Sequence, residues 1–282
     1  MSALDQVKTL LNQGRLDDAL FSLKTCVRDS PSDIAARSTL VSLFALQGDL
    51  DRAQTQFQAQ QNLQGTVLPP AFEKLILASQ TRERVINGQE TPHYLLEKPS
   101  WADDYQTALA AFASTGSESQ LNELSASLTP NLDQISGQTG PLSFEGFRNC
   151  DTRLSPVIEA VIDGVYTWIP LSDLQRLSIP ERPDLVQDLV WCPVILMLTD
   201  SEVRHGHLFT TYPGTAEHGS TAAKLARTVE WDESLQSLDI ARGLQLFYLG
   251  EEATPLFSLG QCSVSGPSNS PDKNREEEHE TA

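Results

Sequence analysis

Three charged residues close together in the sequence have the types and spacing for acid–base chemistry. In the stretch CDTRLSPVIEAVIDGVYTWIPLSDL, residues 150–174, one residue separates Asp151 from Arg153, and Glu159 follows inside an apolar run. Two carboxylates can serve as general acid and general base when their surroundings set their pKa values apart. The same residues can instead form a structural brace, because a buried charge is tolerated only when it is paired. The chain has 38 acidic residues, so carboxylate pairs arise by chance. We therefore favour a surface or ion-pair role over catalysis. Asp151 and Arg153, with Glu159, could form a bridge that pins the first helix of the domain that begins here, and we expect at least one of Asp151 and Arg153 to be partly buried and paired.

Histidines and cysteines supply no further catalytic signature. His205 and His207 form an HxH pair, but a structural zinc site needs four ligands, and no second close pair follows. The four cysteines are far apart and form no CxxC pair, which is typical of free thiols in a reducing cytosol. No GxSxG, HExxH or GxxxxGK[ST] motif occurs. We therefore predict a protein that is not an enzyme and that uses no metal or cofactor.

Aromatic residues beside prolines mark a candidate binding surface. Trp168 and Trp191 each lie two residues before a proline in a segment typical of a strand. Such residues either pack in a core or form the wall of a groove for a partner helix, and the sequence leaves both options open. Because catalytic motifs are missing, we predict that a surface carries the function. A short amphipathic helix would contact Trp168, Trp191 and Tyr212, with Asp188 at the rim.

An internal repeat at the start of the chain predicts the elements that come before these residues. NQGRLDDALFSLK begins at residue 12 and LQGDLDRAQTQFQ at residue 46. Gly14 matches Gly48 and Ala19 matches Ala53, each pair 34 residues apart, which is the period of the tetratricopeptide repeat. The glycines permit a tight turn between two helices, and the alanines let the paired helices approach closely. About three such units are needed to bury a core, so we expect the next segment to continue the stack.

Further helices are predicted up to about residue 130. The segment 69–88 begins with proline and ends with glycine, and 100–130 is typical of two helices interrupted at Gly116. Turn-forming residues then gather at 131–145, which indicates a linker or a domain boundary. We therefore predict a tetratricopeptide-like helical domain over residues 1–135.

The sequence after the helical domain predicts a strand-rich α+β domain over residues 140–265. We expect helices at 154–164 and 171–179. Strands are expected at 165–169, 189–199, 205–212, 227–231, 244–250 and 255–264. The last segment, 266–282, is polar and acidic and is expected to be a disordered tail.

Composition narrows the class of partner. The chain has 282 residues, 39% of them hydrophobic, which is enough to build a core. Its formal net charge of −18 disfavours nucleic acid and anionic membranes, because both carry negative charge. No apolar run reaches the roughly 18 residues that a membrane span needs, and the first residues lack the apolar region of a secretion signal. A cytoplasmic protein is expected.

Four blocks of sequence together resemble one known family. They are DTRLSPVIEAVIDGVYTWIP, RPDLVQDLVWCPVIL, TTYPGT and LARTVEWDESLQSLDIARGLQLF, in this order. This arrangement, after a tetratricopeptide-like half, resembles the ImpE family, which includes accessory proteins of bacterial type VI secretion systems.

The resemblance implies a cytoplasmic, non-catalytic adaptor. Its partner would be the small sheath subunit of the contractile tail (TssB, also called VipA), bound through that subunit's N-terminal helix. The adaptor would thereby link the sheath to its disassembly ATPase, ClpV. Two alternatives stay open: a general tetratricopeptide chaperone that clamps an extended peptide, and a hydrolase-like enzyme centred on Asp151, Arg153 and Glu159.

Overall fold

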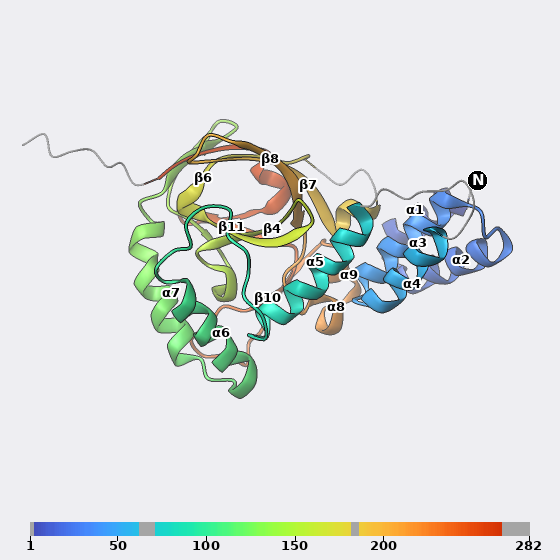
Figure 1. The fold of residues 1–282 in the computed structure, drawn as a ribbon, viewed down its shortest axis with the longest axis horizontal. Coiled ribbons are helices and arrows are strands. Elements are labelled where there is room, and N and C mark those ends of the chain that lie inside the picture. Colours follow the sequence, from blue (N-terminus) through green and yellow to red (C-terminus); the bar gives the residue numbers. More distant parts are fainter. Residues whose placement is uncertain (1–2, 62–70, 182–185, 267–282) are drawn as a thin grey trace, which may run out of the picture.

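Helices occupy the first part of the protein and strands most of the later part, in an α+β arrangement (Figure 1). The computed structural model describes residues 3–61, 71–181 and 186–266. The predicted acidic tail lies outside the described residues, apart from Gly266. The helices are α1 (Ala3–Asn12), α2 (Leu16–Asp29), α3 (Ile34–Leu46), α4 (Leu50–Gln61), α5 (Ala71–Ile86), α6 (Ala102–Thr115), α7 (Ser119–Leu132), α8 (Thr215–His218) and α9 (Thr221–Lys224).

The repeated sequence forms two successive helical hairpins, α1–α2 and α3–α4. Gly14 and Gly48 hold the equivalent turns at φ of 74° and 78°, a conformation that glycine adopts without strain. Ala19 and Ala53 are fully buried, so the paired helices approach closely at both positions. The hairpins therefore recur with the predicted period, while the tetratricopeptide assignment itself stays a prediction.

Helices α5, α6 and α7 connect the hairpins to the strands. Their bounds agree with the helices predicted at 69–88 and 100–130, and Gly116 ends α6 with φ of 71°. In Figure 1, α1–α4 extend away from the sheet, α5 lies between the hairpins and the sheet, and α6 and α7 lie on the other side of α5. Helix α5 thus contacts both parts, and α3 also contacts the strand-rich part directly, at the 3-10 turn Val186–Leu189.

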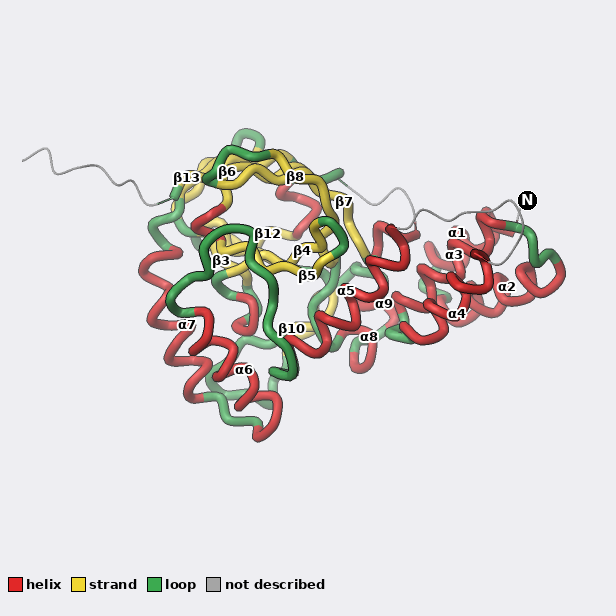
Figure 2. The backbone as a smooth tube through the Cα atoms, viewed as in Figure 1, coloured by secondary structure: helices red, strands yellow, loops and turns green. Residues whose placement is uncertain are grey.

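Most strands of the described residues form one antiparallel sheet (Figure 2). Its eight strands lie in the order β2-β1-β13-β6-β7-β8-β4-β5, beside the smaller sheets β12-β11-β3 and β10-β9. The bounds are β1 (Ser136–Thr139), β2 (Leu142–Glu145), β3 (Phe147–Asn149), β4 (Val157–Ile162), β5 (Val165–Pro170), β6 (Leu174–Ser178), β7 (Trp191–Leu198), β8 (Val203–Phe209), β9 (Val229–Trp231), β10 (Ala241–Gly243), β11 (Leu246–Leu249), β12 (Glu252–Pro255) and β13 (Gln261–Ser265). Each predicted strand segment overlaps one of these.

The helix predicted at 154–164 is wrong, because residues 157–162 form β4. Two-sided burial explains the error: Ile158 packs into one core and Val161 into another, on the opposite face. The sequence of a strand that is buried on both faces is a continuous apolar run, and the sequence of a short buried helix has the same pattern. Asp163 and Gly164, with φ of 54° and 88°, then form the two-residue turn into β5.

The helix predicted at 171–179 and the linker predicted at 131–145 are also wrong. A single 3-10 turn, Leu171–Asp173, leads into β6, whose register against β7 shifts between Leu174 and Arg176. Residues 136–145 form the β1–β2 hairpin at one edge of the large sheet. The turn-forming residues in that stretch belong to a hairpin within the sheet.

Two apolar cores hold the protein together. The sheet-side core lies between the large sheet and β3–β11 and includes Phe147 and Phe247. The helix-side core runs without a break from Val7 of α1 through α5 to Trp168 and Trp191 of the sheet. It therefore crosses the boundary that the composition predicted. Among the described residues, no helix is both long and apolar enough to cross a membrane.

Candidate functional site

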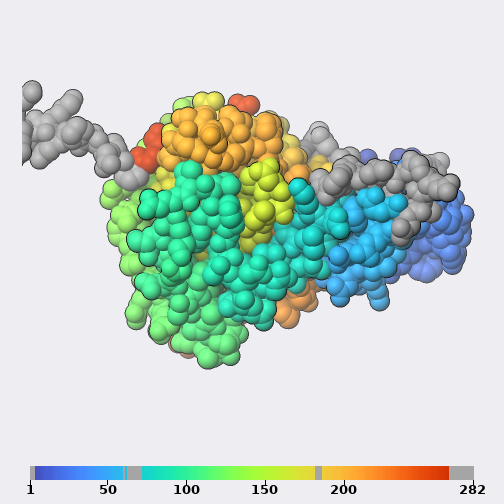
Figure 3. All heavy atoms as spheres, viewed as in Figure 1, coloured from blue at the N-terminus to red at the C-terminus, as the bar shows by residue number. Residues whose placement is uncertain are grey.

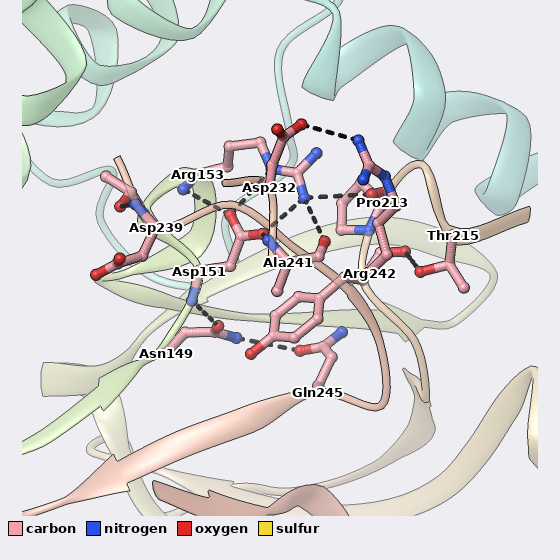
Figure 4. A network of polar contacts seen from close by, with 12 residues as sticks. Asn149, Asp151, Arg153, Pro213, Thr215, Asp232, Asp239, Ala241, Arg242 and Gln245 are labelled. Atoms are coloured by element: carbon pink, nitrogen blue, oxygen red, sulfur yellow. Dashed lines mark hydrogen bonds and ion pairs between the residues drawn. The ribbon is translucent and has the colours of Figure 1, made fainter. Parts of the chain in front are cut away.

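Asp151 and Arg153 form a buried ion pair at the start of the strand-rich part (Figure 4). Arg153 donates from Nε to Oδ1 of Asp151 at 2.9 Å and from Nη2 to Oδ2 at 2.6 Å. The same guanidinium donates to the carbonyls of Pro213 and Ala241, and the amide of Ala241 donates back to Asp151. Asp151 is fully buried and Arg153 nearly so. The pair therefore ties three separate chain segments together.

Glu159 pairs with a residue of the helical part instead of with Arg153. Arg82 of α5 donates to both carboxylate oxygens of Glu159, at 2.9 and 2.6 Å. The Tyr166 hydroxyl donates to the same carboxylate and accepts from the indole of Trp168. Burial, together with the charge of Glu159, raises the pKa of Tyr166 well above its usual value, so the hydroxyl stays a donor. The expectation that Glu159 joins Asp151 and Arg153 in pinning a helix is wrong, because Glu159 lies on strand β4.

Gln245 joins the two ion pairs into one network. Its amide nitrogen donates to Glu159 at 3.3 Å and to the Phe209 carbonyl at 2.9 Å. Its amide oxygen accepts from Asn149, whose own amide oxygen accepts from the backbone of Asp151. Buried polar groups are stable only when their hydrogen bonds are satisfied, and here each carboxylate is bonded on both oxygens. The geometry is that of a structural network.

The arrangement offers little for catalysis. Asp151 and Glu159 are 0% and 1% exposed, so neither carboxylate is open to a substrate. Burial raises the pKa of the neighbouring Cys150 to about 12, which keeps its thiol protonated and a poor nucleophile. Within the described residues, no group of three or more histidine, cysteine or acidic side chains is placed to hold a metal ion.

The residues predicted to contact a partner lie in the interior. Trp168 and Trp191 are 0% exposed, Tyr212 is 1% exposed and Asp188 is 5% exposed. The Trp191 indole donates to Ser79 of α5 at 3.0 Å, and the Tyr212 hydroxyl bonds to the backbone of β11. In this structure the three aromatic side chains are core residues. Their contact with a partner stays a prediction, and it would require these side chains to become exposed.

An open apolar surface continues the face that carries Trp191. Alternate residues of β7 share this outer face with their partners on β8, and the register pairs Trp191 with Phe209 and Ile195 with His205. Helix α5 covers the first pair: Phe72 meets the Trp191 ring edge-on at 6.3 Å, and the Arg82 guanidinium lies 4.2 Å from the Phe209 ring centre. Further along the same face nothing in the described residues covers Ile195, which is 44% exposed.

This uncovered surface is hollowed into a groove of about 800 Å³, here called the β7–β8 groove. Its floor is the outer face of β7 and β8, with Ile195, His205 and His207. One wall is the first turns of α5 with the β4–β5 turn, and the other is the end of β6 with Pro180. In Figure 3 the orange β7–β8 hairpin and the cyan start of α5 lie on one face, with the yellow β4–β5 hairpin between them.

A second, more polar cleft of about 400 Å³ lies where the helical hairpins meet the strand-rich part. Its walls come from the α3–α4 turn, from α5 and from residues 209–218. Arg82 and Arg153 line it, with Glu83 and Glu217 among the other lining residues. Partial burial and, to a lesser extent, the nearby Glu217 raise the pKa of Glu83, and the adjacent Arg82 opposes this rise.

Comparison with known proteins agrees with this architecture. The ImpE protein family model matches residues 142–263. The type VI secretion system accessory component TagJ of Pseudomonas aeruginosa is 34% identical over 254 residues, covering 89% of this chain and 88% of TagJ. A crystal structure of a Vibrio parahaemolyticus protein superposes with a TM-score of 0.83 at 25% identity, over 92% of this chain and 97% of that one. The alignment with TagJ covers 89% of this chain and therefore extends well beyond the residues that the family model matches. The chain belongs to the ImpE family.

Proposed function

We propose that this protein is an accessory adaptor of a type VI secretion system, acting in the cytoplasm without catalysis. The observation that carries the proposal is the 34% identity to TagJ across 89% of the chain, because an accessory role is what that relative's name states. The finer proposal is that the protein binds the N-terminal helix of the small sheath subunit, TssB or VipA. It would thereby link the contractile sheath to its disassembly ATPase, ClpV.

Three features of the molecule support an adaptor. The buried carboxylates of the polar network are fully engaged with protein donors, so they are not free to act on a substrate. The β7–β8 groove is an apolar channel with a few polar groups, the type of surface that accepts an amphipathic helix. The net charge of −18 favours a partner segment that carries basic residues.

Co-purification tests the proposal directly. The full chain, immobilised, is mixed with the small sheath subunit of the same bacterium, either intact or lacking its N-terminal helix. We expect retention of the intact subunit and loss of retention without the helix. Equal retention of both forms would refute capture through the helix. ClpV is then added to the assembled pair, and recovery of ClpV only when all three are present would support the link.

A peptide-clamping chaperone is the second candidate. The polar cleft favours it, because part of its wall belongs to the helical hairpins that would form such a clamp. A clamp would retain peptides unrelated to the sheath subunit, so a panel of unrelated extended peptides distinguishes the two functions.

A further inference from the structure

We propose that the polar cleft binds an extended segment of a partner protein that carries one basic side chain. The cleft, of about 400 Å³, lies between the helical hairpins and the strand-rich part. Its lining offers hydrogen-bond donors, carboxylates and apolar side chains, and each of these selects one feature of the occupant. Such a site goes beyond the sheath-helix contact proposed above, and among the described residues it shares no lining residue with the β7–β8 groove.

Two buried guanidiniums present unused donors to this cleft. Arg82 and Arg153 are only 9% and 8% exposed, and their guanidiniums donate from Nε and Nη2. Within the described residues Nη1 of neither arginine has an acceptor, yet neither Nη1 is fully buried, so each reaches the surface at the cleft that both residues line. Because Glu159 and Asp151 already balance the two positive charges, a neutral acceptor such as a main-chain carbonyl suits these donors better than a second anion.

The spacing of these donors fits an extended main chain. Nη2 of Arg82 donates to the Thr211 carbonyl, and Nη2 of Arg153 donates to the Pro213 carbonyl. The two guanidiniums therefore lie against residues two apart in one segment, whose Cα atoms are at most about 7 Å from each other. Carbonyls along one edge of an extended peptide also recur every second residue, at about 7 Å. One such edge can accept from both Nη1 groups.

Two carboxylates of the lining favour a basic side chain on that segment. Within the described residues neither Glu83 of α5 nor Glu217 of α8 forms an ion pair. Oε1 of Glu217 lies 3.2 Å from the position that a Cβ of Gly48 would take, which places this carboxylate beside the α3–α4 turn at the cleft. Burial and then the charge of Glu217 raise the pKa of Glu83, although Arg82 and Arg84 oppose the rise. A cation placed between the two carboxylates would therefore be stabilised.

The remaining lining suits the other parts of the segment. Leu46, Leu50 and Ile86 give the cleft an apolar wall, which matches the methylene stem of a lysine or arginine. Asn87 and His218 also line the cleft and are exposed, so their side chains are free to accept from the peptide N–H groups. The occupant is thus specified by its main chain and by a single side chain.

Blocked peptides of alanine, glycine and serine with one central arginine, glutamine or glutamate test the proposal. Each is titrated into the isotope-labelled full chain and followed by backbone amide chemical shifts. We expect the arginine peptide to bind, with the largest shifts at residues 45–50, 83–87 and 209–218, and the glutamine peptide to bind about threefold or more weakly. Equal binding of all three peptides, no binding of the arginine peptide, or shifts concentrated at 193–207 would overturn the proposal.

Variants of the two exposed carboxylates locate the basic side chain without disturbing the buried network. Glu83→Gln and Glu217→Gln should each weaken the arginine peptide by about threefold or more and leave the glutamine peptide unchanged. Glu73→Gln is the matched control, since Glu73 is an exposed residue of the same helix α5 that does not line the cleft. Equal weakening by all three variants would reduce the effect to net charge and refute the site. Retention of the sheath subunit, measured on the same variants, should not change, so the two proposals can fail separately; its loss together with the arginine peptide would refute a separate site.

Discussion

Replacing Arg82 with alanine tests whether the helical and strand-rich parts are held together by the buried network. The change removes both donors to Glu159, which would keep only the Tyr166 hydroxyl and the Gln245 amide. It also removes a donor to the Thr211 carbonyl and the guanidinium stacked on Phe209. Removing one partner of a buried pair costs about 3–5 kcal/mol, because the remaining charge stays buried without compensation.

That free energy corresponds to a large change in melting temperature. At roughly 2–4 °C per kcal/mol for a chain of this size class, we expect Arg82→Ala to melt about 6–20 °C below the wild type, followed by circular dichroism. Arg84→Ala is the control on the same helix. Its pair with Glu90 is 45% and 43% exposed, and an exposed pair is worth about 0–1 kcal/mol.

Two outcomes would refute this reasoning. One is an Arg82→Ala protein that melts together with Arg84→Ala, which would show that Glu159 is satisfied without the helix. The other is a double variant, Arg82→Met with Glu159→Gln, that is no more stable than Arg82→Ala. Removing both charges should recover part of the loss, since no unpaired carboxylate would remain buried.

Three further predictions follow from the same geometry. Arg153→Ala should lower the melting temperature more than Arg84→Ala, because it leaves the fully buried Asp151 unpaired; equal and small shifts would contradict the brace. Trp191→Ala should destabilise the fold by about 3–5 kcal/mol in chemical denaturation, because the ring is buried against Phe72; a fully stable variant with weakened binding of the sheath subunit would favour a surface role. Burial lowers the pKa of His207, opposed by Asp188, and a docked helix would lower it further. Affinity for a peptide of the sheath-subunit helix should therefore be constant above the lowered pKa that His207 has in the free protein, and it should weaken as the pH falls below that pKa, whereas His207→Gln should bind with little dependence on pH.

Local signals were sufficient to predict the helices. Each of the glycines at 14, 48 and 116 has positive φ at a helix end, as the sequence pattern indicated. Helical periodicity and helix-end signals depend on residues that are close together in the sequence, so they do not require knowledge of the tertiary contacts. For that reason α5, α6 and α7 were predicted close to their actual bounds.

The strand β4 was missed because its pattern depends on distant partners. Its apolar run is continuous because cores lie on both faces, and neither core can be seen in the local sequence. One local signal was available: Asp163 and Gly164 between two apolar runs are a strong indication of a two-residue hairpin.

The polar network was foreseen only in part. The closeness of Asp151 and Arg153 in sequence pointed to their pairing, but the partner of Glu159 lies 77 residues earlier. A clue was present in α5, where Arg82 occupies the same face as the apolar Leu75 and Ile86, at helical spacings of seven and four residues. A charge inside an apolar stripe usually has a buried partner. The groove could not be predicted, because the exposure of Ile195 depends on how much of the outer face of β7 and β8 is covered by α5.

The unbroken helix-side core has a consequence for how relatives of this protein can diverge. The ImpE family match begins at residue 142, yet the sheet within it relies on Arg82 and Ser79 of α5 for its buried polar partners. An exchange of the two segments between relatives would have to carry both sides of these contacts at once. We therefore expect substitutions at Arg82 and Glu159 to occur together across the family, and we expect residues 140–265 expressed alone to expose Trp191 and aggregate. The helical and strand-rich segments would be inherited as one unit.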